Sequence, residues 1–133
     1  MIYIRFSCIS LAIAVVLGSM GAHAMKPLVS PEAINSWDTA VKYQFYQSIG
    51  LLLLSIAGRL LVVRPVLFSW ALRVLTLGIV FFSGSLYLRS SAAVTGFDFT
   101  WLGPIAPIGG LLFIAGWILA ACSFKNDILP KSA

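Results

Sequence analysis

The sequence predicts an all-α fold: a transmembrane four-helix bundle with a short interfacial amphipathic helix between the first two spans. Three observations lead to this prediction. Of the 133 residues, 60% are hydrophobic and only 10% are charged, whereas a water-soluble domain carries about a quarter charged residues. The mean hydropathy is +1.00. The apolar residues gather in segments of about 20, the length that crosses a bilayer as a helix. We therefore expect lipid to be the solvent for most of the surface.

Four apolar segments qualify as spans: 6–24, 43–63, 67–88 and 103–124. Inside a bilayer no water is available to the backbone amides, so each segment must bond its own amides and form a helix. The connections between the segments are short, and we find no convincing internal repeat or low-complexity linker. The sequence therefore predicts one integral membrane domain over residues 1–133.

The first span ends in residues 18–25, GSMGAHAM. This stretch resembles the cleavage site of a secretory signal peptide, because an A-x-A pattern follows a basic residue and an apolar core. The apolar run is, however, longer than the 7–15 residues or so of a signal core. Small residues also recur at four-residue intervals, a pattern that lets helices approach closely in lipid: Ala14, Gly18 and Ala22. We therefore expect the segment to be kept as the first transmembrane helix.

The first loop contains the signal for a helix start. Residues 30–32, Ser-Pro-Glu, combine a hydroxyl cap, a proline at the first helical position and an acid in the first turn. Apolar residues follow at helical spacing: Ile34, Trp37, Val41 and Phe45. This pattern predicts the interfacial amphipathic segment, running into the second span. Trp37 and Trp101 fit an aromatic belt at the membrane surface.

The second and third spans are joined at Arg64-Pro65, where the proline predicts a tight turn. Four spans place both termini on one side of the membrane. That side holds six basic residues: Arg5, Arg59, Arg64, Arg73, Lys125 and Lys131. The opposite loops hold three: Lys26, Lys42 and Arg89. The excess predicts cytoplasmic termini. The acids lean the other way, with only Asp127 inside.

Four stretches together resemble the YgdD-like family of small bacterial inner-membrane proteins: GSMGAHAM (18–25), YQFYQSIGLLLL (43–54), FFSGSLYL (81–88) and GPIAPIGGLLFIAGW (103–117). The resemblance covers nearly the whole chain. It implies a four-helix inner-membrane protein of unknown function, with mitochondrial transmembrane relatives in animals, in which residues 18–25 end the first helix. Family members often carry a histidine where this sequence has Gln47. The departure disfavours any metal pair of two histidines.

The predicted topology brings the polar residues of the spans to the outer end of the bundle: His23, Tyr43, Gln44, Gln47, Ser83, Ser85 and Tyr87. Polar groups in lipid are unfavourable unless they are hydrogen-bonded, so we expect them to face one another. His23 either caps its helix, handles protons or contacts a ligand. The others form interhelical hydrogen bonds or a binding site. Gly109 and Gly110 predict a close-packing face, with a broken transporter-like helix as the alternative.

No enzyme class is indicated, because the chain has one histidine, no acid within a span and no cysteine pair such as CxxC. We expect no cofactor and no metal. The net charge of +5 comes from scattered basic residues that the topology explains, so no nucleic-acid partner is expected. The sequence favours a structural or accessory membrane module with a polar cluster near the outer leaflet. Its expected partners are membrane lipid and either other membrane proteins or copies of itself. The alternative is a small transporter or channel-like protein using His23 and the Tyr43–Ser48 cluster.

Overall fold

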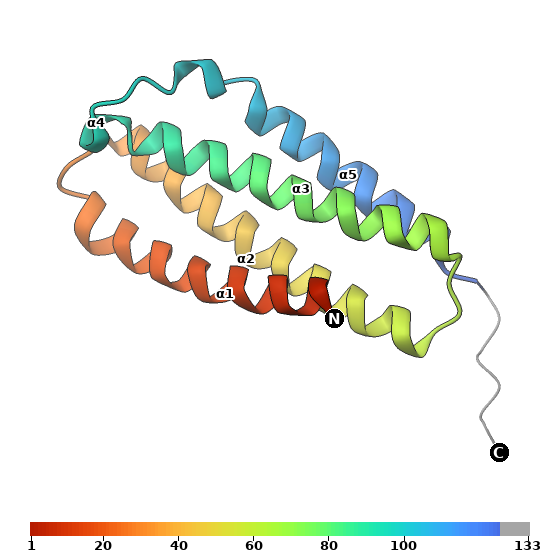
Figure 1. Cartoon of the computed structure of the whole chain (residues 1–133). Helices are drawn as coiled ribbons and strands as arrows, with labels where there is room; N and C mark the ends of the chain where they lie inside the picture. The colour runs from red at the N-terminus through yellow and green to blue at the C-terminus, as the bar shows by residue number, and fades with distance from the viewer. Residues whose placement is uncertain (126–133) are drawn as a thin grey trace.

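A computed structural model describes residues 1–125 and contains four long helices that run antiparallel (Figure 1). Helix α1 covers Ile2–Met20 and continues as a π-helical turn over Gly21–Met25. Helices α2, α3 and α5 cover Pro31–Leu60, Pro65–Ser90 and Ile105–Ser123. The connection before α5 holds α4 (Ala92–Thr95) and a 3-10 turn at Thr100–Leu102. The all-α prediction is confirmed. Lys131 and Asp127, used above for orientation, lie outside the described residues.

Three helical segments of the described chain are long and apolar enough to cross a membrane: Ile2–Met25, Pro65–Ser90 and Thr100–Ser123. The predicted second span is not among them. Its helix, α2, contains Tyr43, Gln44, Gln47 and Ser48 within six residues, and these side chains lower its hydropathy. An integral membrane protein is therefore supported, while the fourth crossing depends on how α2 lies among its neighbours.

The predicted interfacial helix is not a separate element. Helix α2 is continuous over 30 residues, because no proline interrupts it after Pro31. Its start is as predicted, since the Ser30 hydroxyl accepts a hydrogen bond from the Ala33 amide at 3.2 Å. Trp37, expected in the aromatic belt, is instead only 4% exposed. Its indole N–H donates to the Leu17 carbonyl at 2.8 Å, which ties the start of α2 to the end of α1.

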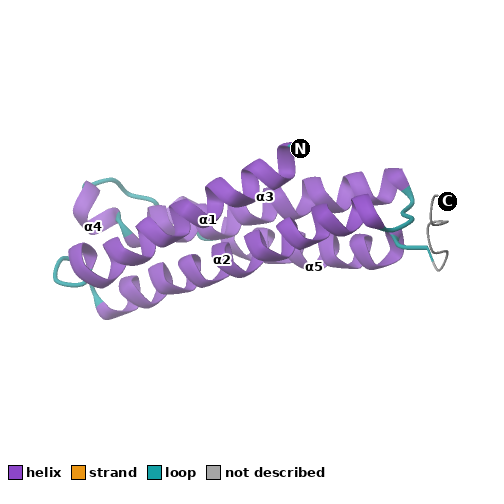
Figure 2. Ribbon diagram, turned by 90° about the horizontal axis from the view of Figure 1, so that it is seen from below, coloured by secondary structure: helices purple, strands orange, loops and turns teal. Residues whose placement is uncertain are grey.

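The four long helices form a staggered array, and the predicted four-helix bundle with a separate interfacial helix is not confirmed in that exact form. Each packs mainly on its neighbour in the chain: α1 on α2, α2 on α3 and α3 on α5. Figure 1 shows α1 and α5 at the two edges, and Figure 2 shows all four running lengthwise with α4 at one end. The shared apolar core lies mainly between α2, α3 and α5: Leu51, Leu54, Ala71, Leu72, Leu75, Ile79, Phe113 and Ala120.

Helices α3 and α5 pack extensively on one another and come into close backbone contact at Gly109. A Cβ placed on Gly109 would lie 2.7 Å from the Cα of Phe82, so the two backbones touch. Gly116, seven residues further along α5, makes a similar close approach to Leu75 of α3. Gly110, predicted to share this face, has no foreign atom nearer than 3.9 Å. One glycine of the predicted pair therefore packs against α3, and the other has open space beside it.

The predicted small-residue stripe on α1 is correct for its first two members only. Ala14 is 1% exposed, and a Cβ on Gly18 would meet Val41 of α2 at 3.4 Å. Ala22 is exposed, whereas Gly21 is buried against Trp37. A four-residue interval advances about 40° around a helix of 3.6 residues per turn, so two such steps rotate Ala22 about 80° away from Ala14. Gly21, at a seven-residue interval, stays within about 20°.

The turn between α2 and α3 also closes the end of α5. The Arg64 amide donates to the Ser123 carbonyl at 2.7 Å, and the Lys125 amide donates to Val62 at 3.0 Å. The guanidinium of Arg64 donates to the Cys122 carbonyl at 2.9 Å. A cation at a helix C-terminus satisfies free carbonyls and complements the helix dipole. The predicted Arg64-Pro65 turn is therefore confirmed and has a second role as a cap.

Candidate functional site

Gln44 is the centre of a polar network that joins three helices. Its side chain is 6% exposed. The amide nitrogen donates to the carbonyl oxygen of Ser10 on α1 at 2.9 Å and to the Ser10 hydroxyl at 3.2 Å. The amide oxygen accepts a hydrogen bond from the Tyr87 hydroxyl of α3 at 2.7 Å. One side chain of α2 therefore uses both ends of its amide to hold its two neighbours.

Two serine hydroxyls, one from α2 and one from α3, make further hydrogen bonds between the helices next to Gln44. The Ser48 hydroxyl donates to the Ser10 hydroxyl at 2.8 Å. The Ser83 hydroxyl of α3 donates to the carbonyl of Ala40 at 2.9 Å. We call these five residues the polar network: Ser10, Gln44, Ser48, Ser83 and Tyr87. Interhelical hydrogen bonds in lipid contribute about 0.6–2 kcal/mol each, so the arrangement is well suited to hold α1, α2 and α3 in register.

Ser10 is the member that the sequence reasoning missed. It lies four residues before Ala14, so it continues the small-residue stripe of α1 toward the N-terminus. Ser7, which is also fully buried, continues the stripe one turn further. The sequence does contain a signal for Ser10. It is a polar residue on the packing stripe of an apolar helix, and such a residue needs a hydrogen-bond partner on the facing helix.

His23 does not join the polar network. It lies in the π-helical turn at the end of α1, where its side chain is exposed. Thirteen residues separate it from Ser10, which corresponds to about 20 Å along the helix at 1.5 Å per residue. The prediction placed all the polar residues together beneath the outer end. The structure instead gathers Gln44, Ser83 and Tyr87 deeper in the array and leaves His23 at its end. Ser85 is buried but donates to Phe82 of its own helix.

Tyr43 and Gln47 lie together on a different face of α2, where they line a groove between α2, α3 and α5. The groove has a volume of about 800 Å³. The Tyr43 ring lies 4.5 Å from the ring of Phe82, centroid to centroid. The Gln47 amide oxygen accepts a hydrogen bond from the Trp117 indole at 2.8 Å. Most of the lining is aliphatic and aromatic, so the groove is suited to apolar groups.

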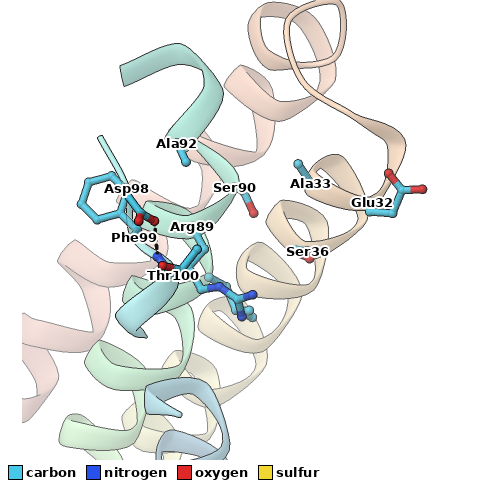
Figure 3. A pocket seen from close by; sticks show the side chains of 10 residues that line it. Glu32, Ala33, Ser36, Arg89, Ser90, Ala92, Asp98, Phe99 and Thr100 are labelled. Atoms are coloured by element: carbon cyan, nitrogen blue, oxygen red, sulfur yellow. Dashed lines mark hydrogen bonds between the residues drawn. The ribbon is translucent and has the colours of Figure 1, made fainter. Parts of the chain in front are cut away.

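A smaller, polar pocket of about 270 Å³ lies at the end of the array near α4. Figure 3 shows how three segments build it: Glu32, Ala33 and Ser36 come from α2, Arg89 and Ser90 from α3, and Asp98, Phe99 and Thr100 from the connection to α5. We call this the end pocket. Sequence reasoning did not predict it, because its three segments are far apart along the chain.

Both carboxylates of the end pocket favour their charged form. The Thr100 amide donates to Asp98 at 2.8 Å, and this bond lowers the pKa of the Asp98 carboxyl. The pKa of Glu32 is lowered first by its own backbone amide and then by the Ser30 hydroxyl. Hydrogen bonds donated to a carboxylate stabilise its ionised state. The pocket therefore presents two anionic groups and the cationic Arg89.

No group of three histidine, cysteine, aspartate or glutamate side chains that could hold a metal occurs within residues 1–125. The two cysteines, Cys8 and Cys122, are exposed free thiols. The polar network consists of neutral amide and hydroxyl groups, and it contains no nucleophile paired with a base. Its chemistry is that of hydrogen bonding between helices.

Comparison with known proteins adds the family. A family described as "Protein of unknown function (DUF423)" matches residues 17–110. A UPF0382 membrane protein of Staphylococcus haemolyticus is 35% identical over 122 residues, which cover 92% of this chain and 93% of the relative. The UPF0382 membrane protein YwdK of Bacillus subtilis is 34% identical over 119 residues, with 89% and 91% covered.

A third relative is the UPF0382 inner membrane protein YgdD of Escherichia coli, 32% identical over 114 residues that cover 86% of this chain and 82% of the relative. No solved structure matches significantly. The match to YgdD confirms the resemblance seen in the four sequence stretches. The family match and the relatives that align over nearly the whole chain show that this chain belongs to the DUF423 family of UPF0382 membrane proteins.

Proposed function

We propose that this chain is a non-catalytic accessory protein of the bacterial inner membrane, which crosses the bilayer four times and docks a helix of another membrane protein. The observation that carries the proposal is the division of its polar groups. Those of the polar network are used for hydrogen bonds within the chain, while the groove beside it faces outward. Such a module is held together internally and offers one shaped surface to a neighbour.

The fourth crossing is supported by the position of α2. This helix lies between α1 and α3 and packs on both. If α1 and α3 cross the bilayer, α2 must cross with them. Its polar side chains are tolerated because Gln44 and Ser48 are turned toward α1 and α3 and hydrogen-bonded there. Four crossings place both termini on one side, and the excess of basic residues favours the cytoplasm.

The shape of the groove supports a helix as its occupant. Its α5 wall is formed by residues at intervals of three and four: Pro107, Gly110, Leu111, Ile114, Trp117 and Ile118. This stripe runs along the axis of α5 for about 16 Å at 1.5 Å per residue, which corresponds to three turns of a partner helix. Gly110 leaves room for close approach, as small residues do at helix contacts in lipid.

The proposal is tested by placing a photo-crosslinking amino acid at Ile114, in the groove, and in a separate variant at Ile13, on the outward face of α1. Illumination of intact cells should join position 114 to one membrane protein, which should also co-purify with the unmodified chain in mild detergent. Position 13 should give only lipid adducts. Lipid adducts alone at both positions would contradict the docking function.

A small transporter is the second candidate, and the groove is the observation that favours it, because Tyr43 and Gln47 line a cavity large enough for a small molecule. The transporter prediction from the sequence assigned His23 to the same site as Tyr43 and Gln47. Replacing His23 by alanine should leave the amount of folded protein unchanged, because the side chain is exposed. If the substitution abolished uptake or export of a compound by cells, transport would be favoured over docking.

A further inference from the structure

The end pocket lies at the depth where a bilayer has its polar headgroups. It is built where α2 begins, where α3 ends and where the chain leads into α5. In a chain whose α3 and α5 cross the hydrocarbon core, these helix ends reach the headgroup region. Phe97 and Trp101 on the same connection are 69% and 70% exposed, and exposed aromatic side chains are typical of this interface.

One hydroxyl group in the end pocket has no partner in the protein. Ser90 is 3% exposed, yet its Oγ makes no hydrogen bond within residues 1–125. Other serines on this part of the chain behave differently: Ser85 and Ser91 donate to carbonyls of the preceding turn, as helical serines commonly do. A buried hydroxyl without a partner is unfavourable. Because Ser90 lines the pocket (Figure 3), a group bound there would supply the missing bond.

The charges around Ser90 define the chemistry of that group. Arg89, the next residue on α3, and Ser36 on α2 offer donors beside the Ser90 hydroxyl, a set suited to a phosphate. Asp98, on the connection to α5, is anionic and suited to a primary ammonium, whereas the Glu32 carboxylate lies at the opposite rim and points away from the pocket (Figure 3). A single ligand that satisfies the donors and Asp98 carries a phosphate and an ammonium group a few atoms apart.

We propose that the end pocket binds the headgroup of phosphatidylethanolamine, with the phosphate at Arg89 and Ser90 and the ammonium at Asp98. The volume of about 270 Å³ corresponds to roughly nine water molecules at 30 Å³ each, which admits this small headgroup. The acyl chains remain in the surrounding bilayer. The role is recognition of a lipid, and it is independent of the partner that occupies the groove.

Native mass spectrometry of the full-length protein in mild detergent tests the proposal. Phosphatidylethanolamine, phosphatidylcholine and phosphatidylglycerol with the same acyl chains are added at equal concentration, and the first bound lipid is counted. The ethanolamine lipid should bind at least several-fold more tightly, because the choline lipid has no N–H to donate and the glycerol lipid has no ammonium. Ser90→Ala should weaken its binding about tenfold, the effect of one lost hydrogen bond to a charged group.

The chain contains a matched control for that substitution. Ser7 is also buried with an unpartnered Oγ, but it lies on α1, away from the end pocket. Ser7→Ala and Ser90→Ala each delete one unbonded hydroxyl, so neither should lower the melting temperature of the lipid-free protein. Only Ser90→Ala should change lipid binding. Arg89→Gln should weaken binding of all three lipids, and Asp98→Asn should remove the preference for the ethanolamine lipid.

Three results would overturn the proposal. The first is equal binding of the three lipids by the unmodified protein. The second is an equal effect of Ser7→Ala and Ser90→Ala on binding. The third is displacement of the lipid by water-soluble glycerophosphoethanolamine at the same concentration, which would mean that the pocket takes a free zwitterion and gains nothing from the bilayer.

Discussion

Gln44 and Gln47 are three residues apart on α2, yet their amides have different roles. Gln44 is buried and makes three hydrogen bonds to residues of α1 and α3. Gln47 makes one, to Trp117 of α5, at the edge of the groove. Three residues correspond to about 300° around a helix, so the two side chains leave α2 in different directions. The pair therefore ties α2 to all three of the other long helices.

The difference between the two glutamines gives a prediction. Gln44→Ala should lower the free energy of unfolding by about 1–3 kcal/mol, because it also leaves the Tyr87 hydroxyl without its partner. Gln47→Ala should lower it by about 0.6 kcal/mol, the mean value of one hydrogen bond between helices in lipid. Unfolding by dodecyl sulfate in mixed micelles, followed by circular dichroism, measures both. Equal effects would contradict a central role of Gln44.

Helices α3 and α5 pack through glycines. Of the neighbouring Gly109 and Gly110, the first contacts α3 and the second has open space beside it. A side chain at Gly109 meets the backbone of Phe82, which cannot move without α3. A side chain at Gly110 meets only the edge of the Phe82 ring, at 3.9 Å. Close approach of this kind replaces the hydrophobic effect as the driving force between helices in lipid.

We predict opposite results for alanine at these two positions. Gly109→Ala should destabilise the protein by about 1–3 kcal/mol or more through overpacking. Gly110→Ala should be neutral or should stabilise α5 by up to about 1 kcal/mol, since alanine favours the helix over glycine. Size-exclusion chromatography after heating at a series of temperatures reports the loss of monodisperse protein. A loss at lower temperature for Gly110→Ala than for Gly109→Ala would reverse the assignment.

The end of α1 offers a second matched pair. Gly21→Val places a side chain against Trp37, whose indole Cδ1 would lie 2.6 Å from the new Cβ. We expect it to disturb the Trp37–Leu17 hydrogen bond and to change the near-ultraviolet circular dichroism of the tryptophans. Ala22→Val, on the exposed side, should leave that spectrum unchanged. A spectral change for Ala22→Val alone would favour the stripe that the sequence predicts.

On the scale of the whole molecule, α1 and α5 lie at opposite edges of the array (Figure 1) and do not pack substantially on one another. Both edge helices therefore keep apolar faces that no other helix of the described residues covers. The groove lies on one of these faces, next to α5. The connections cover the two ends, with the end pocket at one and the Arg64 cap at the other.

The proposed orientation of this array predicts the outcome of fusion experiments. A fluorescent protein joined to the C-terminus should fluoresce, because it folds in the cytoplasm. Alkaline phosphatase joined after Thr95, in the connection between α4 and α5, should be active, because it requires the periplasm. Active phosphatase at the C-terminus together with an inactive fusion after Thr95 would invert the orientation.

The sequence by itself determined that this is a membrane protein, that its long apolar segments are helical, that Ser30 caps a helix and that Arg64-Pro65 forms a turn. Each of these depends on hydropathy or on interactions between residues close in the chain, which a linear pattern records. The family followed from the same kind of information, through four stretches in order.

Tertiary structure alone decided which polar residues meet. Tyr43, Gln44 and Gln47 form one cluster in the sequence, but the rotation of α2 turns Gln44 inward and the other two toward the groove. It also decided that Gly21 packs in place of Ala22, that Ser10 joins Gln44 and that Ser90 meets two other segments in the end pocket. The physical reason is that these contacts depend on the rotation and depth of one helix against another. The rotation and the depth of each helix are determined jointly by contacts between residues that are far apart in the chain, and a linear pattern does not record those contacts.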